Sequence, residues 1–380
     1  MGENVYSIKH ICVFSGGICV FEMTFRSIRQ FQKRLHRNLL WLALGILIFM
    51  PVHAWGGNSA VIFMYHRFGE GDFPSTSIRM DQFEAHLKEL KTGGYTVKAL
   101  QDIIKAFKDG SALPDRAVAL TVDDAYFSVY EKAWPRFKEL GYPFTVFVST
   151  DPVDRGIRGY MSWDQIREMG LGGATIGNHT VSHLHMAKAG ISTNRRELDD
   201  SNARLLKELG YKPDLIAYPY GETSERIIQL VRSSGFTAGF GQHSGVAAKT
   251  PDLFYLPRFA LNEKYGDIER FRLAANALAL KVDDVTPNDP LVDKDADNPP
   301  VYGFTITGDE ALTKSLNRLA CFTSHEGKLD VSRLGGESGQ TRIEVRMQKP
   351  LPNGRTRLNC TLPAGKGRWY WYGSQFYTRQ

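Results

Sequence analysis

The chain has 380 residues, which is enough for one large domain and a smaller one. Hydrophobic residues make up 42% of it and charged residues 23%, a composition that excludes a disordered or collagen-like protein. The formal net charge is +6, but residues 1–54 carry six Lys or Arg and two Asp or Glu, so residues 55–380 keep only +2. This near balance leaves no basic stripe and excludes nucleic acid as the expected partner.

The N-terminal segment has the order of regions found in a signal peptide. Several Lys and Arg residues precede the apolar stretch 39–50, which is followed by the small-residue cleavage pattern Val52-His53-Ala54. The apolar stretch is short for a membrane span. We expect residues 1–54 to be a leader and signal peptide, with translation starting at the first residue or at Met23, and the protein to be periplasmic or extracellular. The alternative is an uncleaved membrane anchor.

From residue 60 the sequence alternates short apolar runs with amphipathic stretches, the pattern of repeated β/α units. Strands are expected where apolar residues run together, at 61–65, 117–122, 144–148, 174–178, 214–218, 236–240 and 254–259. Helices are expected where apolar residues recur at helical spacing, at 80–90, 99–107, 126–140, 162–169, 194–209 and 223–234. Seven such strands favour an α/β fold, a distorted parallel (β/α) barrel over residues 55–280.

Residues 281–300 are rich in Asp, Asn and Pro and are typical of a linker. Beyond them, short alternating segments punctuated by glycines predict a small antiparallel all-β domain over residues 301–380, of unknown role. Its Trp369-Tyr370-Trp371-Tyr372 cluster could stack on sugar rings, although core and edge packing is the more common use. Cys321 and Cys360 are the two cysteines that follow the leader, and we expect them to form a disulfide in an oxidising compartment.

Two groups of polar residues carry the candidate chemistry. Asp123 and Asp124 end the apolar run 117–122, and the carboxyl ends of barrel strands are where active sites lie. Burying adjacent carboxylates is costly without a metal or substrate partner. His179 and His183 stand four apart, so on a helical turn both imidazoles would share one face, and a carboxylate from elsewhere would complete a divalent metal site. Such a histidine pair alone is more often structural than ligating, and the carboxylate pair favours the metal.

Six motifs occur in an order that resembles one family. They are Met64-Tyr65-His66-Arg67, Ala119-Leu120-Thr121-Val122-Asp123-Asp124-Ala125-Tyr126, Phe144-Thr145-Val146-Phe147-Val148, Ser162-Trp163-Asp164-Gln165, Ile176-Gly177-Asn178-His179-Thr180-Val181-Ser182-His183 and Ala217-Tyr218-Pro219-Tyr220-Gly221. Residues 60–262 resemble the polysaccharide deacetylase family, the NodB homology domain of carbohydrate esterase family 4. The similarity is greatest to the branch that acts on exported or biofilm poly-N-acetylglucosamine, and it does not extend to the C-terminal region.

The resemblance implies roles for these residues. Asp124, His179 and His183 would bind a divalent metal, zinc by preference, with cobalt or nickel as alternatives, and Asp123 would be the general base. Neighbouring residues at a strand end point in different directions, so one carboxylate can join the histidines while the other stays free to take a proton. The resemblance also implies that the backbone N–H of Tyr220 stabilises the oxyanion, in a turn that proline and glycine make tight.

Two positions depart from the family pattern near the base. Ala125 stands where glycine is common, in a place where a left-handed turn or close substrate approach can require it. Ala217 stands where many members carry an arginine that holds the base aspartate. We expect Arg258, at a late strand end, to take the place of that arginine beside Asp123.

The proton donor for the leaving amine is less determined, because the family's late histidine has no counterpart between His243 and His325. The candidates for the general acid are His66 first, with His185 and His243 as alternatives. Aromatic residues near the motifs could stack on pyranose rings. They are Trp163, Tyr126, Tyr218 and Tyr220.

These features predict an exported, metal-dependent deacetylase that hydrolyses N-acetyl groups of an amino-sugar polymer or oligosaccharide. One alternative is a related hydrolase of linear C–N amide bonds in another substrate. The other is a catalytically inactive, glycan-binding protein of the same fold. An N-acetylated glycan is the expected partner, and membrane contact is expected only through the signal peptide or an uncleaved anchor.

Overall fold

The computed structural model describes residues 8–14, 17–23, 57–250, 252–293, 297–336 and 339–379. The chain divides into two compact units, 1–54 and 55–380. In the first unit, β1 (Ile8–Phe14) and β2 (Gly17–Met23) pair as an antiparallel hairpin. The basic, apolar and cleavage regions of the expected signal peptide lie outside the described residues. Within the described parts of the chain, none of the helices has the length and apolar character needed to cross a membrane.

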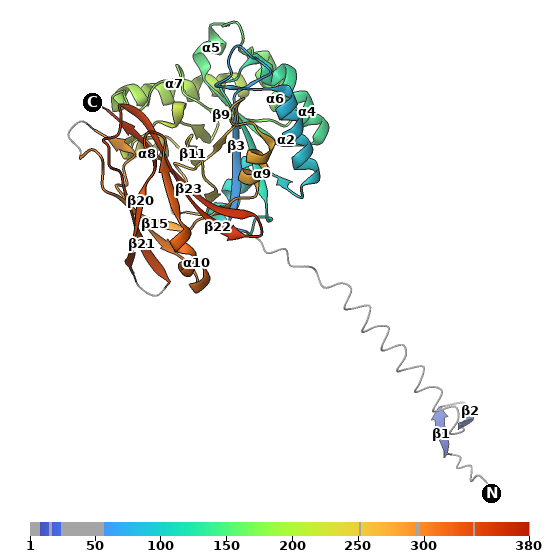
Figure 1. Ribbon diagram of the computed structural model, residues 1–380. Coiled ribbons are helices and arrows are strands. Elements are labelled where there is room, and N and C mark those ends of the chain that lie inside the picture. The colour runs from blue at the N-terminus through green and yellow to red at the C-terminus, as the bar shows by residue number, and fades with distance from the viewer. Residues whose placement is uncertain are drawn as a thin grey trace. The chain divides into compact units, whose positions relative to one another are not determined.

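A curled parallel sheet lies at the centre of the second unit (Figure 1). Its parallel strands are β3 (Ser59–Tyr65), β7 (Ala117–Asp123), β8 (Phe144–Val148), β9 (Thr175–Asn178), β10 (Leu215–Ala217), β11 (Ala238–Phe240) and β13 (Phe259–Ala260). They follow the order β11-β10-β9-β8-β7-β3-β13 across the sheet. Every residue of β7 and β8 is buried, as expected for strands covered on both faces. The predicted α/β fold with seven parallel strands is confirmed.

The barrel is distorted where its two edges meet. A single parallel bridge joins Phe240 at the end of β11 to Leu256, and the backbone N–H of Gly241 donates to the carbonyl of Leu256 over 2.9 Å. The strand expected at 254–259 is therefore mostly irregular, and β13 begins only at Phe259. Pro257 explains part of this, because it has no N–H to donate to a strand ladder. This part of the chain also contains four short strands: β4 (Arg67–Phe68), β5 (Ser77–Ile78), β6 (Thr96–Val97) and β12 (Ala247–Ala248).

Helices pack around this sheet, mostly where their apolar periodicity predicted them. They are α2 (Met80–Thr92), α3 (Leu100–Asp109), α4 (Trp134–Leu140), α5 (Thr150–Asp154), α6 (Trp163–Leu171), α7 (Ile191–Leu209), α8 (Glu225–Ser233) and α9 (Ile268–Ala275). The helix expected at 126–140 begins late: a π-helical turn, η1 (Val129–Ala133), precedes α4. Pro135 lies in the first turn of α4, where its missing N–H costs nothing. No helix was predicted at the positions of α5 and α9.

Two further sheets form the C-terminal β region. One contains β14 (Leu278–Ala279), β16 (Leu291–Val292), β18 (Ala320–Thr323), β19 (Gly327–Lys328), β22 (Gly354–Gly365) and β23 (Arg368–Thr378). The other contains β15 (Val282–Thr286), β17 (Tyr302–Thr307), β20 (Asp330–Gly335) and β21 (Gln340–Arg346), and α10 (Glu310–Ser315) follows β17. Buried residues of both sheets share one apolar core. The segment 281–300 contributes β15 and β16, and β14 and β16 run parallel to β23, so the region is not purely antiparallel.

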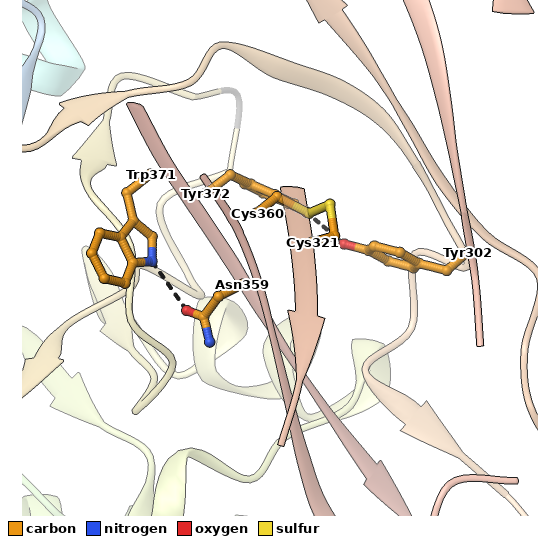
Figure 2. The surroundings of a disulfide bond; sticks show 6 residues. All are labelled: Tyr302, Cys321, Asn359, Cys360, Trp371 and Tyr372. Carbon is orange, nitrogen blue, oxygen red and sulfur yellow. Dashed lines mark hydrogen bonds between the residues drawn. A yellow bond between two sulfur atoms is a disulfide. The ribbon is translucent and has the colours of Figure 1, made fainter. Parts of the chain in front are cut away.

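A disulfide joins Cys321 of β18 to Cys360 of β22, which face one another across the sheet (Figure 2). In the same view, the hydroxyls of Tyr302 and Tyr372 lie 2.9 Å apart, and the indole N–H of Trp371 donates to Asn359 over 3.1 Å. The ring of Trp371 also packs edge-on against Phe259 of β13, with centroids 5.1 Å apart. Trp371 and Tyr372 of the aromatic cluster are therefore packing residues.

The C-terminal β region also contacts the barrel through polar groups. At the start of β23, Arg368 donates to the carbonyl of Asn276 over 2.8 Å and forms an ion pair with Asp115 at 2.9 Å. The two parts of unit 55–380 thus meet through specific side chains rather than only through the connecting chain.

Candidate metal and catalytic centre

Three side chains that can ligate a metal converge at the carboxyl ends of β7 and β9. The Oδ1 atom of Asp124 lies 3.4 Å from Nε2 of His179 and 3.3 Å from Nε2 of His183. One ligand atom from each of these residues falls within 4.8 Å of the others. An Asp-His-His set with this spacing leaves open positions for water and substrate on a bound ion.

The hydrogen bonds of His179 show that this set suits a cation. Nδ1 lies 2.7 Å from the backbone carbonyl of Ala217, which can only accept, so Nδ1 carries the proton and Nε2 presents a lone pair. Nε2 is fully buried and has no hydrogen-bond partner, and it faces the carboxylate of Asp124. Two acceptors that face one another in the interior need a positive charge between them. The residues present therefore fit a divalent metal ion.

The protonation of the two histidines differs in the metal-free chain. Burial lowers the pKa of His183 to about 4, so its imidazole is neutral at physiological pH, the form that ligates metals. Burial also acts to lower the pKa of His179, but the carboxylate of Asp124, 3.4 Å from Nε2, and the charge of Asp123 outweigh it and raise the pKa above its ordinary value. A bound cation would take the place of that proton.

The helical turn expected for the histidine pair is wrong. Residues 179–183 form a loop after β9, with Thr180 at φ 66° and His183 at φ 56°. The carboxylate of Glu197, on α7, fixes this loop by accepting from two consecutive backbone N–H groups, each over 2.9 Å. The four-residue spacing correctly predicted that the rings of His179 and His183 lie close together. Left-handed residues, rather than helical periodicity, bring the two rings together.

The turn after β7 separates the two aspartates. Asp124 has φ 78° and Ala125 has φ 55°, both in the left-handed region that favours glycine. The left-handed turn anticipated at position 125 is therefore present, with a buried alanine in it. Each such residue costs roughly 1–2 kcal/mol, and strain of this kind gathers at functional sites. The turn carries Asp124 toward the histidines and leaves Asp123 on the strand.

Asp123 is held by Arg258, as the loss of an arginine at position 217 led us to expect. The guanidinium donates to both carboxylate oxygens, with Nη1–Oδ1 at 2.7 Å and Nη2–Oδ2 at 2.8 Å, and both side chains are 0% exposed. A further bond from Nε to the carbonyl of Gly241 over 2.9 Å fixes the arginine. Burial alone would raise the pKa of Asp123, but the charge of Arg258, with that of His179, holds the pKa below its ordinary value. Asp123 is thus ionised at neutral pH.

The three candidate proton donors occupy different surroundings. Nε2 of His66, directly after β3, lies 4.0 Å from Oδ2 of Asp123, the predicted base. His185 is partly exposed, and its Nδ1 lies 2.8 Å from the carboxylate of Glu222. His243 is 3% exposed, and burial lowers its pKa to about 3, so it is neutral and shielded from substrate.

The turn Tyr218-Pro219-Tyr220-Gly221 lies beside the histidines. Tyr220 adopts φ 60°, and its ring packs against His183 with centroids 4.4 Å apart. Gly221 has φ 68° and approaches the backbone of Gln242 so closely that a Cβ atom would lie 2.5 Å from its nitrogen. Tyr218 is fully buried, and its hydroxyl donates to the carbonyl of Phe254 over 2.8 Å, so its ring is not available to a sugar.

Comparison with known proteins also indicates a deacetylase. Residues 110–239 match the model of the polysaccharide deacetylase family. The expected resemblance to this family is confirmed over these residues, which make up about a third of the chain. A poly-beta-1,6-N-acetyl-D-glucosamine N-deacetylase of Staphylococcus aureus is 26% identical to it, over 60% of this chain and 93% of the relative.

Two solved structures are similar to this chain in fold. IcaB from Ammonifex degensii is 26% identical, has a TM-score of 0.50 and is matched over 58% of this chain and 98% of its own. The Streptococcus pyogenes deacetylase PplD, solved in complex with acetate, is 23% identical, with a TM-score of 0.53 over 57% of this chain and 98% of its own. Neither match extends over the whole chain.

The remaining aromatic candidates differ in their contacts. The indole N–H of Trp163, at the start of α6, donates to Asp154 over 2.7 Å, and Arg204 covers its ring at 4.8 Å, contacts typical of a packing residue. Tyr126 follows the turn that carries Asp124. Its ring lies 3.4 Å from the guanidinium of Arg67 and 4.7 Å from the ring of Tyr160. Tyr126 is the aromatic candidate nearest to Asp124 in the chain, although it is 8% exposed. Arg67 belongs to the first motif, whereas Tyr160 is a neighbour that no motif had singled out.

Proposed function

We propose that the protein is an exported, metal-dependent deacetylase that hydrolyses N-acetyl groups of an amino-sugar polymer. The observation that carries this proposal is the unpartnered, buried Nε2 of His179 facing Asp124, beside an aspartate that Arg258 keeps ionised. The S. aureus relative is named for poly-β-1,6-N-acetylglucosamine, so that polymer is the first substrate to test.

The residues divide the hydrolysis between them. A divalent ion held by Asp124, His179 and His183 would polarise the acetamide carbonyl and lower the pKa of the attacking water. Asp123 takes a proton from that water, whose oxygen adds to the carbonyl carbon. The backbone N–H of Tyr220 donates to the developing oxyanion. The C–N bond then breaks, the nitrogen receives a proton, and the products are an amine and acetate.

His66 is the proposed proton donor to the leaving nitrogen, because it lies beside Asp123 at the open end of the barrel. Replacing it with glutamine is expected to lower kcat for acetate release from the glycan by about 10²-fold, since general acid catalysis contributes on that order. The same His66→Gln variant should hydrolyse 4-nitrophenyl acetate at close to the parental rate, because nitrophenolate leaves without a proton. Parallel kinetics on the two substrates make the measurement.

The partly exposed His185 provides the comparison for this assignment. If His185→Gln shows the selective loss on the glycan and His66→Gln does not, the proton donor is His185 and our assignment is wrong. Equal losses on both substrates in His66→Gln would instead indicate a damaged centre rather than a missing acid.

Export is proposed from two observations. The leader has the basic, apolar and small regions of a signal peptide, and the disulfide Cys321–Cys360 belongs to an oxidising compartment. The protein recovered from outside the cytoplasm should begin at Trp55 and contain no free thiol. A membrane-bound form that retains the leader would support the uncleaved anchor.

The function itself is tested by acetate release. Chitin oligomers, poly-β-1,6-N-acetylglucosamine and peptidoglycan are each incubated with the protein, with added zinc and with chelator. We expect acetate from at least one polymer, and its loss with chelator. No acetate from any of them with metal supplied contradicts the proposal, and glycan binding that resists chelator would then support the inactive, glycan-binding alternative.

A further inference from the structure

The C-terminal β region reaches into the catalytic centre at one place. Gln375 of β23 is 1% exposed, and its Nε2 donates to the carbonyls of Tyr220 and Gly221 over 3.3 and 2.8 Å. Gln375 lies 155 residues along the chain from Tyr220. Because both partners are carbonyl oxygens, the amide must turn its nitrogen toward them. Its Oε1 then has no hydrogen-bond partner. Among the described residues, the side chain of Gln375 therefore makes hydrogen bonds only to this turn.

These bonds fix the peptide plane that follows Tyr220. The N–H of Gly221, in that plane, donates to the carbonyl of Tyr218 over 2.8 Å, and the carbonyl of Tyr220, in the same plane, accepts from Gln375. The next carbonyl, that of Gly221, accepts from the hydroxyl of Tyr255 over 2.8 Å as well as from Gln375. The peptide plane after Tyr220 is thus held at both ends. This maintains the positive φ of Tyr220, and with it the direction of that residue's own backbone N–H.

A second residue of the same sheet closes around the side chain of Tyr220. The guanidinium of Arg355, on β22, lies 5.3 Å from the ring of Tyr220, and its Nη1 lies 3.5 Å from the carbonyl of that residue. The ring of His185 stacks on Tyr220, with centroids 3.9 Å apart and planes 4° from parallel. Glu222 is 2% exposed and lies between the two, 2.8 Å from His185 and 3.6 Å from Arg355. Arg355 and His185 thus pack against the ring of Tyr220, and Glu222 links these two side chains.

We propose that Gln375 and Arg355 are positioning residues of the deacetylase reaction, through which the C-terminal β region aims the backbone N–H of Tyr220 at the oxyanion. This inference rests on the proposed function. It assigns the C-terminal region a part in catalysis that the motifs of the barrel do not contain. An N–H that is held in place before the reaction needs no reorganisation as charge develops on the oxygen.

The test uses the full chain loaded with zinc and the polymer that the parent protein deacetylates. Gln375→Leu and Arg355→Met remove the donors and keep the side-chain size close. We expect kcat to fall about tenfold in each, less than the 10²–10³-fold that loss of an oxyanion donor itself costs. KM and the zinc affinity measured by calorimetry should stay within about twofold, because neither residue touches the ligand set.

Arg368→Met is the matched control. Arg368 also joins β23 to the barrel, but its partners are Asp115 and Asn276, and it stands seven residues, or about 23 Å of strand, from Gln375. If Gln375→Leu and Arg355→Met retain the kcat of Arg368→Met, the inference is overturned. Should Gln375→Leu fail to fold, Arg355→Met at its exposed position decides the question.

A second measurement separates this inference from the proposed function. Amide hydrogen exchange at Gly221 and Glu222 should be faster in Gln375→Leu than in the parent and in Arg368→Met, whether or not acetate is released. A parent protein that releases no acetate contradicts the proposed function. Unchanged exchange at the turn contradicts the positioning by Gln375.

Discussion

Replacing Arg258 with methionine is expected to lower the free energy of unfolding by about 3–5 kcal/mol, because it leaves the Asp123 carboxylate buried without a partner. Both side chains are 0% exposed, so water cannot readily replace the guanidinium. Urea denaturation of the purified variant measures the loss. The surviving activity should shift as well: without Arg258, burial raises the pKa of Asp123, and the acid limb of the pH–rate profile moves to higher pH.

The double variant Asp123→Asn, Arg258→Met is the control for this prediction. It removes the charge of both partners, so the free energy of unfolding should recover toward that of the parent. A loss below about 1 kcal/mol in Arg258→Met alone would show that solvent reaches the carboxylate, against the burial described here.

Asp123→Asn is expected to lower kcat for acetate release by about 10²–10⁴-fold, the contribution of a general base. The amide is close in size to the carboxylate and Asp124 is untouched, so the variant should still bind one zinc ion per chain. Metal analysis of the dialysed protein, alongside initial rates on the polymer, makes the measurement.

Asp124→Asn separates the two aspartates. It weakens the Asp-His-His set itself, so bound zinc and activity should be lost together. If Asp123→Asn lost its zinc and Asp124→Asn kept it, the roles of the two carboxylates would be reversed.

The sequence predicted the part of the centre that depends on local chain geometry. Asp123 and Asp124 end a strand that is buried throughout, and a strand end is visible in one stretch of sequence. Arg258 was found by a different route, from the absence of an arginine at position 217 and the presence of one at the end of the strand expected at 254–259. Its contact with Asp123 was predicted correctly, but Arg258 precedes β13 rather than ending a strand.

What the sequence could not predict depends on loops and on distant pairing. The turn of the histidine loop is set by left-handed residues and by Glu197, which no spacing reveals. The segment 281–300 has the composition of a linker, yet pairing with β17 and β23 makes parts of it strands. Gln375 carries no local signal, since its partners lie more than 150 residues earlier in the chain.

The position of Arg258 also bears on how related chains should be compared. The family resemblance implies an arginine at the end of β10, where this chain has Ala217, whereas the guanidinium that donates to Asp123 comes from Arg258, directly before β13. β10 and β13 lie near opposite ends of the sheet order, but the two edges meet at the bridge between Phe240 and Leu256, and the segment after that bridge brings Arg258 to Asp123. A column-by-column alignment would score this chain as having lost the arginine. Comparing such chains by which charges surround the buried aspartate, rather than by which alignment column holds them, would keep this chain among the candidate enzymes to be tested.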